Sequence, residues 1–573
     1  MKANWILKPQ FPELPTRELA QALQIPCFIA QLLQQRGINN RLQAVSFFNP
    51  HLQPLHDPFL MYNLLVAVKR IEKAILNQER VLLYGDYDVD GTTAVALMAE
   101  QLEILGLSCE FYIPDRYKEG YGVSNLGIDY AMEKGIQLLI TLDCGIKAHE
   151  QLSRASLHGI DCIVCDHHQP ENTLPKAIIL NPKQEKCTYP YKELSGCGVA
   201  YKLLQGLYVH LGLDQKNLIR SLDLVALSIG ADIVELLDEN RSLCAMGLKR
   251  LNEEPRPAFL AILELASKQL PLSLRDVVFT LAPRINAAGR IASGSRAVDW
   301  MRSKDNFQIK SLALAIDNDN TTRRALDQKT TQEALEIIEA DVSFSNKVST
   351  VVYNSNWHKG VVGIVASRLI ESYYRPTIVL TQTDGVLSGS ARCMPPLNLY
   401  QLLENCQDHL LQFGGHQFAA GLSLKLTSLE AFKHCFDIEV SKALKGQNLE
   451  NKINIDTKIN FSELGSNTSQ DFPRLIKILN AFEPCGPGNL HPVFLAENCI
   501  ITQIRILKDA HLKLKLIDNH DQEELDAIGF QMANLQQDLI EGMAVDVVFG
   551  LKENTFNNKT SLQLILKDLC VSA

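Results

Sequence analysis

Residues 80–106 read RVLLYGDYDVDGTTAVALMAEQLEILG, and this stretch decides the fold. The apolar run that closes at Gly85 has the length of a buried strand, and the apolar positions after the acids have helical spacing. Between the two lie Asp86, Asp88 and Asp90, and the next glycine lets the chain turn at once into the helix. A strand, an acidic turn and a helix in this order are typical of a parallel sheet that is covered by helices.

The same alternation continues to about residue 168 and predicts a parallel sheet with helices on both faces. Residues 200–340 are mostly helical, and 311–340 contain neither glycine nor proline, which favours a long connecting helix. The alternation resumes near residue 348, and short strands with turns between them follow from about 447. We therefore expect an α/β protein in five parts, which are an N-terminal segment 1–50, a parallel-sheet metal-binding domain 51–235, a helical connector 236–340, a smaller α/β domain 341–446 and a C-terminal β-barrel 447–573.

The composition is that of an ordinary globular protein. The 573 residues are 46% hydrophobic and 21% charged, and the net charge is −9. This balance argues against a chain that coats nucleic acid by bulk charge, and it suits a protein that binds cations. No apolar run approaches the roughly 20 residues that span a bilayer, and no signal peptide is recognisable. The sequence therefore predicts a cytoplasmic protein without a membrane association, whose fourteen cysteines are reduced thiols.

Acids and imidazoles follow the predicted strands at the edge where a doubly wound sheet binds its ligands. Asp143 follows one strand, and Asp166, His167 and His168 follow the next. Asp232 follows an apolar run that is compatible with either a strand or a helix. Any one of them has an ordinary explanation as a turn or N-cap residue. Together they would repel one another at one edge of the sheet unless cations neutralised them.

The donor set mixes carboxylates with imidazoles and needs no thiolate, which suits Mn²⁺ or Mg²⁺ better than structural zinc. The aspartate-rich turn at 86–91 resembles a calcium loop but lacks the glutamate at its twelfth position. The donors are too many for one ion and fit two ions roughly 3.5–4 Å apart, the arrangement that hydrolyses phosphate esters. An imidazole outside the coordination sphere could contact the phosphate or protonate the leaving oxygen.

Longer motifs resemble a known family. YGDYDVDGTTA, TLDCG, CDHH and GADIV, in this order and spacing, resemble the four motifs of the DHH phosphoesterase superfamily. LSGCGVAYKL, LAPRINAAGRI, HKGVVGIVASRLIE and FGGHQFAAGLSL closely resemble the bacterial RecJ family within it. EPCGPGNLHPVF resembles the start of that family's C-terminal OB-like domain, so the resemblance extends from about residue 40 to the end.

The resemblance implies a single-stranded-DNA-specific exonuclease that acts in the 5′-to-3′ direction, releases mononucleotides and serves recombination and repair. It implies two divalent cations, Mn²⁺ or Mg²⁺, and among their ligands it makes Asp143 the bridging residue. The implied metal ligands are Asp86, Asp88, Asp90, Asp143, His167 and Asp232. Asp166 is either a ligand or a residue that orients one, and the same alternative is open for Asp86. His168 would contact the scissile phosphate and, with Asp143, Asp88 and Asp90, make up the catalytic set.

The smaller α/β domain resembles the DHH-associated domain, which implies that it binds substrate. The implied substrate-binding residues are Arg284, Asn286, Arg290, His358, Arg392, Gly414, Gly415 and His416. For the helix start near His358, a well-packed glycine turn is an equally good interpretation. Residues 271–330 hold ten basic and six acidic side chains, and Lys513 and Lys515 would share one face of a barrel strand, where they are either groove residues or solvated lysines.

Two alternatives remain at the level of the sequence. The first is a superfamily phosphodiesterase for short oligonucleotides or cyclic dinucleotides, or a pyrophosphatase. The second is an inactive DNA-binding scaffold on the same fold. The long connector and the third domain argue against the first, and the complete set of acids and histidines argues against the second. The family resemblance also implies a single-stranded-DNA-binding protein and a RecQ-type helicase as partners.

Overall fold

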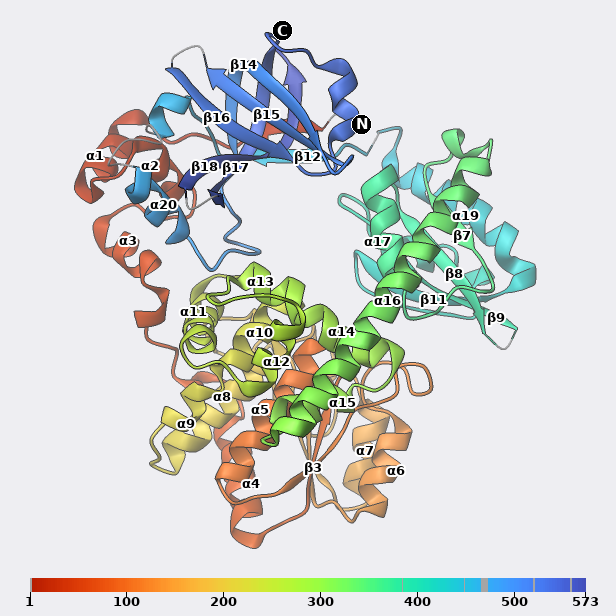
Figure 1. The fold of residues 1–573 in the computed structure, drawn as a ribbon. Helices are drawn as coiled ribbons and strands as arrows, with labels where there is room; N and C mark the ends of the chain where they lie inside the picture. Colours follow the sequence, from red (N-terminus) through yellow and green to blue (C-terminus); the bar gives the residue numbers. More distant parts are fainter. Residues whose placement is uncertain are drawn as a thin grey trace.

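The first half of the chain contains a five-stranded sheet in which all neighbouring strands are parallel (Figure 1). The computed structural model describes residues 3–383, 385–447, 449–464, 472–518, 521–556 and 559–572. The strand order is β3-β2-β4-β5-β6, with bounds β2 (Val81–Gly85), β3 (Cys109–Tyr112), β4 (Leu138–Leu142), β5 (Asp161–Cys165) and β6 (Ile178–Leu180). The predicted parallel sheet is confirmed.

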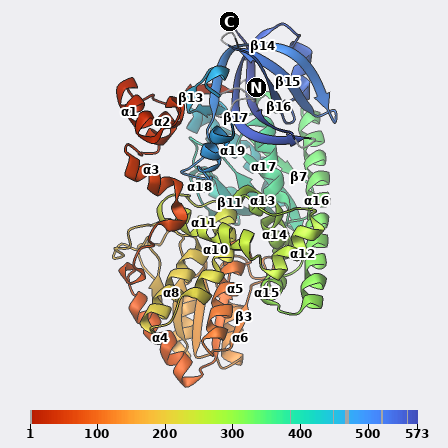
Figure 2. The same ribbon diagram turned by 60° about the vertical axis from the view of Figure 1, so that its left-hand side comes forward.

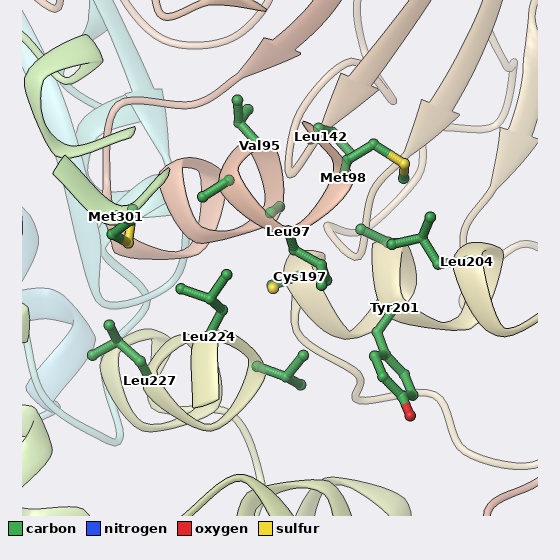
Figure 3. Packing of buried hydrophobic residues seen from close by; sticks show 14 of the residues in the cluster. Val95, Leu97, Met98, Leu142, Cys197, Tyr201, Leu204, Leu224, Leu227 and Met301 are labelled. Carbon is green, nitrogen blue, oxygen red and sulfur yellow. The ribbon is translucent and has the colours of Figure 1, made fainter. Parts of the chain in front are cut away.

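Helices cover both faces of this sheet and continue into a helical region. They are α4 (Leu64–Asn77), α5 (Val89–Ile104), α6 (Asn125–Glu133), α7 (His149–Leu157), α8 (Gly196–His210), α9 (Lys216–Arg220), α10 (Leu222–Asp232), α11 (Asp238–Glu253), α12 (Pro257–Leu265), α13 (Leu274–Thr280), α14 (Ala282–Ile291) and α15 (Ser295–Arg302). Helix α5 is apolar on nearly all sides because it lies between the sheet and the α8–α10 pair. Figure 3 shows Met98 of α5 near Leu204 of α8 and Leu97 of α5 near Cys197 of α8, whereas Val95 points to the opposite side of α5.

A single helix, α16 (Asn306–Ala340), connects the two halves of the chain (Figure 2). Its 35 residues span about 50 Å at the rise of an α-helix. The long helix predicted over 311–340 is present and begins five residues earlier, where Asp305 caps it by accepting a hydrogen bond from the Gln308 N–H. In the described residues no helix, α16 included, is both long enough and apolar enough to cross a membrane.

The second α/β domain has a mixed sheet of order β10-β11-β9-β8-β7. Only β7 and β8 run parallel among its pairs, and the remaining neighbours are antiparallel. Its elements are β7 (Thr350–Tyr353), α17 (Val362–Tyr373), β8 (Thr377–Thr383), β9 (Val386–Arg392), α18 (Leu399–Glu404), β10 (Gln412–Gly415), β11 (Ala419–Lys425) and α19 (Leu429–Leu444). The hairpin β10–β11 forms one edge of this sheet.

The C-terminal region forms a closed barrel, as predicted. Its elements are β12 (Lys452–Ile455), β13 (Thr457–Lys458), α20 (Phe472–Asn480), β14 (Phe494–Leu507), β15 (His511–Asp518), β16 (Asp521–Gly529), β17 (Ala544–Phe556) and β18 (Lys559–Val571). Strand β14 pairs with β15 on one side and with β17 on the other, and this second pairing closes the barrel.

The N-terminal segment packs on this barrel although more than 400 residues separate the two in sequence (Figure 1). Strand β1 (Asn4–Leu7) pairs in parallel with β12, and the indole of Trp5 donates a 2.8 Å hydrogen bond to Asp568. Helices α1 (Glu13–Leu23) and α2 (Cys27–Gln34) share a core with the barrel, where Phe28 contacts Phe494 edge-on, and α3 (Arg41–Phe48) follows. The sequence predicted only a separate segment over 1–50, and the pairing of β1 with β12 was not predicted.

Candidate metal centre

The predicted acidic residues lie together at the carboxyl edge of the parallel sheet. Asp86 follows β2, Asp143 follows β4 and Asp166 follows β5, so neighbouring parallel strands deliver all three to one edge. The φ of Asp143 is 62°, an uncommon value for a residue other than glycine and one that clusters at functional sites. Asp232 is the last residue of α10, so the apolar run before it is a helix.

The side-chain donor atoms form two groups that could each hold an ion. Within each group the donor atoms all lie within 4.8 Å of one another. The groups are Asp86, Asp88 and Asp143, and Asp90, His167 and Asp232, and a third set of Asp143, His167 and His168 links them. Nε2 of His167 lies 3.2 Å from Oδ1 of Asp143 and 3.5 Å from Oδ2 of Asp232. Asp143 therefore adjoins both groups, which is the position that a bridging carboxylate requires.

Several of these donor atoms are buried without a hydrogen-bond partner. They are Oδ1 of Asp86, Oδ1 of Asp143 and both ring nitrogens of His167. Burial raises the pKa of Asp143 well above its ordinary value, and repulsion from neighbouring aspartates raises it further. The same two causes raise the pKa of Asp232 to about 9. Orphaned donors and crowded carboxylates are costly unless cations lie among them, so these residues fit two divalent ions.

Backbone and hydroxyl groups hold the acids in place. The first turn of α8 donates to both oxygens of Asp90, from Gly196 N to Oδ2 at 2.6 Å and from Cys197 N to Oδ1 at 2.7 Å. The hydroxyl of Ser228 donates to the same Oδ1 at 2.7 Å. Asp88 is the N-cap of α5 and accepts a 3.1 Å hydrogen bond from the first turn of that helix. The N-termini of α8 and α5 thus orient Asp90 and Asp88, which are members of the two donor groups.

Asp166 uses both of its oxygens to hold neighbouring groups. Its Oδ1 accepts from the backbone N of His168 at 3.0 Å and lies 2.8 Å from the ring Nδ1, and its Oδ2 accepts from Ile146 N at 2.9 Å. Burial alone would raise the pKa of Asp166, but the contacts with His168 outweigh it and lower the pKa. Burial alone would lower the pKa of His168, and Asp166 reverses this so that the pKa is raised. This geometry favours a positioning role for Asp166 over ligation.

Two residues that the sequence did not single out also hold His168. The hydroxyl of Tyr121 lies 3.0 Å from its Nε2, and the buried amide of Asn181 donates a 2.9 Å hydrogen bond to its carbonyl. Tyr121 belongs to the loop 115–122 after β3, a strand that carries none of the motifs identified in the sequence. Only the glycines, tyrosines and basic residues of that loop could have indicated from the sequence that it belongs to the site.

The Gly-Gly-His segment of the second α/β domain reaches this site. The ring of His416 stacks on that of His168, with centroids 6.5 Å apart and 15° between the planes. Gly415 has a φ of 150°, and a Cβ there would lie 2.4 Å from the carbonyl oxygen of Ala419, so this position needs glycine. No atom lies within 4 Å of a Cβ built on Gly414, which leaves its backbone open to a ligand.

Three arginines gather between the two α/β domains. Burial lowers the pKa of Arg290 to about 10, and repulsion from Arg116 and Arg392 contributes to the shift. The guanidinium of Arg290 donates to the carbonyl of Gly360 at 3.1 Å, and that of Arg116 lies 4.7 Å from the centre of the Tyr87 ring. Within the described ranges none of the three forms an ion pair with a carboxylate. Guanidinium groups in such a cluster favour an anionic ligand.

The other predicted substrate-binding residues differ in how free their side chains are to contact DNA. The guanidinium of Arg284 is already paired with Asp317 at 2.7 Å, whereas Asn286 is half-buried in α14. The ring of His358 meets Tyr117 edge-on at 6.2 Å, and its Nδ1 accepts a 3.0 Å hydrogen bond from the backbone two residues later. Of these residues, Arg284 is thus the least able to contact DNA without first breaking an ion pair.

Two lysines of barrel strand β15 lie on one face of the strand, but each is paired with a carboxylate. Residues along β15 alternate between buried and half-buried, which places Lys513 and Lys515 on the outer side as predicted. Lys513 lies 3.3 Å from Asp526, and Lys515 pairs with Glu524 on the same neighbouring strand. The sequence could not show these cross-strand pairs, which weaken the case for a basic groove at this strand.

Removing metal should destabilise the fold measurably, because the crowded carboxylates lose their counter-charge. We expect Mn²⁺ to raise the thermal unfolding midpoint of EDTA-treated protein, with a gain of about 2.7 kcal/mol when the ion exceeds its Kd 100-fold. Scanning fluorimetry with and without Mn²⁺, at matched ionic strength set with NaCl, measures the effect. An unchanged or lower midpoint in Mn²⁺ would contradict the ligand assignment.

Comparison with known proteins identifies the family. Three family models match, described as the DHH family N-terminal domain (residues 80–229), the DHHA1 domain (345–442) and the RecJ OB domain (455–568). Proteins named single-stranded-DNA-specific exonuclease RecJ are similar along nearly the whole chain. The Bacillus subtilis protein is 35% identical over 97% of this chain and 69% of its own length, and the Haemophilus influenzae protein is 34% identical over 92% and 93%.

Solved structures support the same family assignment. The crystal structure of RecJ from Thermus thermophilus in complex with Mn²⁺ superposes with a TM-score of 0.84 at 26% identity, covering 100% of this chain and 80% of that one. A crystal structure of exonuclease RecJ bound to manganese covers 70% of this chain and 100% of its own, with a TM-score of 0.61 at 30% identity. On the length and level of these similarities, the chain belongs to the RecJ family of single-stranded-DNA-specific exonucleases.

Proposed function

We propose that this chain is a metal-dependent exonuclease that degrades single-stranded DNA from the 5′ end to mononucleotides. The observation that carries the proposal is the convergence of three features on one site. Two donor groups adjoin Asp143, His168 is held in front of them, and His416 of the second α/β domain faces His168. The additional barrel domain favours a polymeric substrate, because a small phosphoester would not need a further domain to hold it.

The ligands proposed for Mn²⁺ or Mg²⁺ are Asp86, Asp88, Asp90, Asp143, His167 and Asp232. Two such ions supply positive charge at the scissile phosphate and activate water. The Nδ1 of His168 faces Asp166, so its Nε2 is the atom that can donate to a phosphate oxygen. In the free protein Tyr121 contacts that Nε2, and we assign it the role of orienting the ring.

The arginine cluster offers a physical reason for the 5′ polarity. A terminal phosphate carries more negative charge than an internal diester, so three guanidiniums without carboxylate partners favour a strand end that bears phosphate. Arg116 stacks on the tyrosine between Asp86 and Asp88, which places the cluster beside the proposed ligands. We propose that Arg116, Arg290 and Arg392 bind the 5′-terminal phosphate while the next diester lies at the metal centre.

Replacing Arg392 with alanine should weaken the preference for 5′-phosphorylated over 5′-hydroxyl strands by about 10- to 100-fold, the value of one charged hydrogen bond. The kcat/KM values for the two strands, compared in the wild type and the variant, measure the preference. Arg154→Ala is the matched control, because that arginine is half-buried on α7 and pairs with Asp129. An unchanged preference in Arg392→Ala would remove the cluster from end recognition.

The activity itself is tested with one assay. The protein is incubated with Mn²⁺ and a long single strand labelled at either end, with a cyclic dinucleotide and pyrophosphate as competitors. Early release of labelled mononucleotide from the 5′-labelled strand alone is expected. Cleavage of the small competitors alone would support a small-molecule phosphodiesterase, and binding without cleavage would support a scaffold.

The partners and the location are inferred only from the family resemblance. We propose that a single-stranded-DNA-binding protein and a RecQ-type helicase deliver strands to this chain in the cytoplasm. Co-purification of the tagged full-length chain with either protein, after nuclease treatment to remove bridging DNA, tests the proposal. Loss of both partners after that treatment would show that DNA alone linked them.

A further inference from the structure

Two cysteines of the second α/β domain lie in direct contact. The sulfur atoms of Cys406 and Cys435 are 3.2 Å apart, and both residues are reduced in the structure. Cys406 follows α18 and is 1% exposed, whereas Cys435 lies in α19 and is partly accessible. The segments that carry them are therefore packed with thiol against thiol.

A neighbouring contact shows that the two segments are aligned and not merely close. The amide of Asn405 donates a 2.9 Å hydrogen bond to Glu439. Asn405 precedes Cys406, and Glu439 lies one helical turn after Cys435 on the same face of α19. The Asn405–Glu439 and Cys406–Cys435 contacts therefore join the same two surfaces. The carboxylate of Glu439 also contacts Lys442, which fixes that turn of α19. Two successive contacts of this kind hold the sulfur atoms in register.

The CxxC of β5 provides a contrast. Cys162 and Cys165 are three residues apart in a strand, so their side chains point to opposite faces of the sheet. Cys162 belongs to the core on one face of the sheet, and Cys165 belongs to the core on the other. The cysteine motif that is most visible in the sequence therefore cannot form a bridge, while two cysteines 29 positions apart can.

We propose that Cys406 and Cys435 are a modification site, at which a peroxide oxidant forms a reversible disulfide bond. Hydrogen peroxide oxidises the more accessible Cys435 thiol to a sulfenic acid and releases one water. The Cys406 sulfur then attacks the Cys435 sulfur, the S–S bond forms as the S–O bond breaks, and a second water leaves. Overall, two thiols and one peroxide give one disulfide and two waters, and a dithiol reductant reverses the reaction.

The bond requires little rearrangement of the domain. A disulfide has an S–S distance of about 2 Å, so the two sulfurs need to approach by only about 1 Å. The bridge closes the loop from 406 to 435, which contains β10, β11 and the Gly-Gly-His segment. We infer that the disulfide restrains the β10–β11 hairpin, which carries His416, without displacing it. This restraint stabilises the domain.

The experiment treats the full-length protein with increasing hydrogen peroxide, alkylates the remaining thiols and identifies disulfide-linked peptides by mass spectrometry. We expect the Cys406–Cys435 peptide to be the first linked species and to disappear after dithiothreitol. Cys27 is exposed and serves as the internal marker that oxidant has reacted. Oxidised Cys27 together with separately alkylated Cys406 and Cys435 would overturn the proposal.

Hydrogen exchange tests the consequence for the domain. Amides of β10 and β11 should exchange on the order of 10- to 100-fold more slowly in the oxidised than in the reduced wild type. Cys435→Ser should show no such difference, whereas the control Cys27→Ser should behave like the wild type. A bridge that forms without slowing exchange in this segment would refute the stabilising role.

Discussion

Replacing Asp143 with alanine should lower kcat for single-stranded DNA by at least about 10³-fold, because removing a single electrostatic contributor already costs 10²–10³ in other hydrolases. Asp143 adjoins both donor groups, and its Oδ1 lies 3.2 Å from His167. Its loss therefore affects both ions at once, whereas the loss of Asp86 or Asp232 would affect one group. Steady-state kinetics in Mn²⁺ over a range of metal concentrations measures the effect.

DNA binding should survive this change, since the arginine cluster and the barrel do not depend on Asp143. Fluorescence anisotropy with a labelled single strand should give a Kd within a few-fold of the wild type. Asp214→Ala is the matched control, because Asp214 is an exposed aspartate between α8 and α9 that pairs with Lys216. Turnover by Asp143→Ala at more than a hundredth of the wild-type rate would remove Asp143 from the bridging role.

The substitution Gly196→Ala should lower kcat by about 10²-fold or more without removing any ligand, an effect expected when reacting groups are displaced by about 1 Å. A Cβ on Gly196 would lie 2.6 Å from both Cβ and Oδ1 of Asp143, closer than such atoms can approach. The N–H of the same residue donates to Asp90 at 2.6 Å. Either Asp143 or the first turn of α8 must move, and both movements disturb the donor groups.

The matched control is Gly421→Ala, because the nearest atom to a Cβ on Gly421 is 3.9 Å away. Circular dichroism and the thermal midpoint should show that Gly196→Ala is folded, and kinetics then isolates the effect on catalysis. A folded Gly196→Ala variant with wild-type kcat and unchanged metal affinity would mean that Asp143 tolerates the displacement.

The catalytic sheet and much of its edge could be predicted from the sequence, because the pattern is local there. The apolar runs of β2, β4 and β5 each end in acids within a few residues, and parallel strands bring those ends together whatever the loops do. Asp86, Asp143 and Asp166 were assigned to one edge in this way, and the structure places them there. Asp232 is different, since it arrives on a helix and only the motif resemblance connected it to the others.

What could not be predicted depends on contacts between distant segments. Tyr121 and Arg116 lie in the loop after β3, which carries none of the recognised motifs, so no local rule marked them. The acidic partners of Lys513 and Lys515 lie across a strand pair whose register no local pattern sets. The contact of Cys406 with Cys435 likewise requires the packing of α18 on α19.

The pairing of β1 with β12 has a consequence for synthesis of the chain on the ribosome. Asn4 finds its partner at Lys452, about 450 residues later, a delay of about 20–90 s at ordinary rates of translation. During that interval the apolar side chains of α2 can pack on α1 but lack the barrel residues that cover them in the finished fold. The growing chain therefore exposes part of a hydrophobic helix until the barrel is made, and chaperones act on transiently exposed apolar surface of this kind.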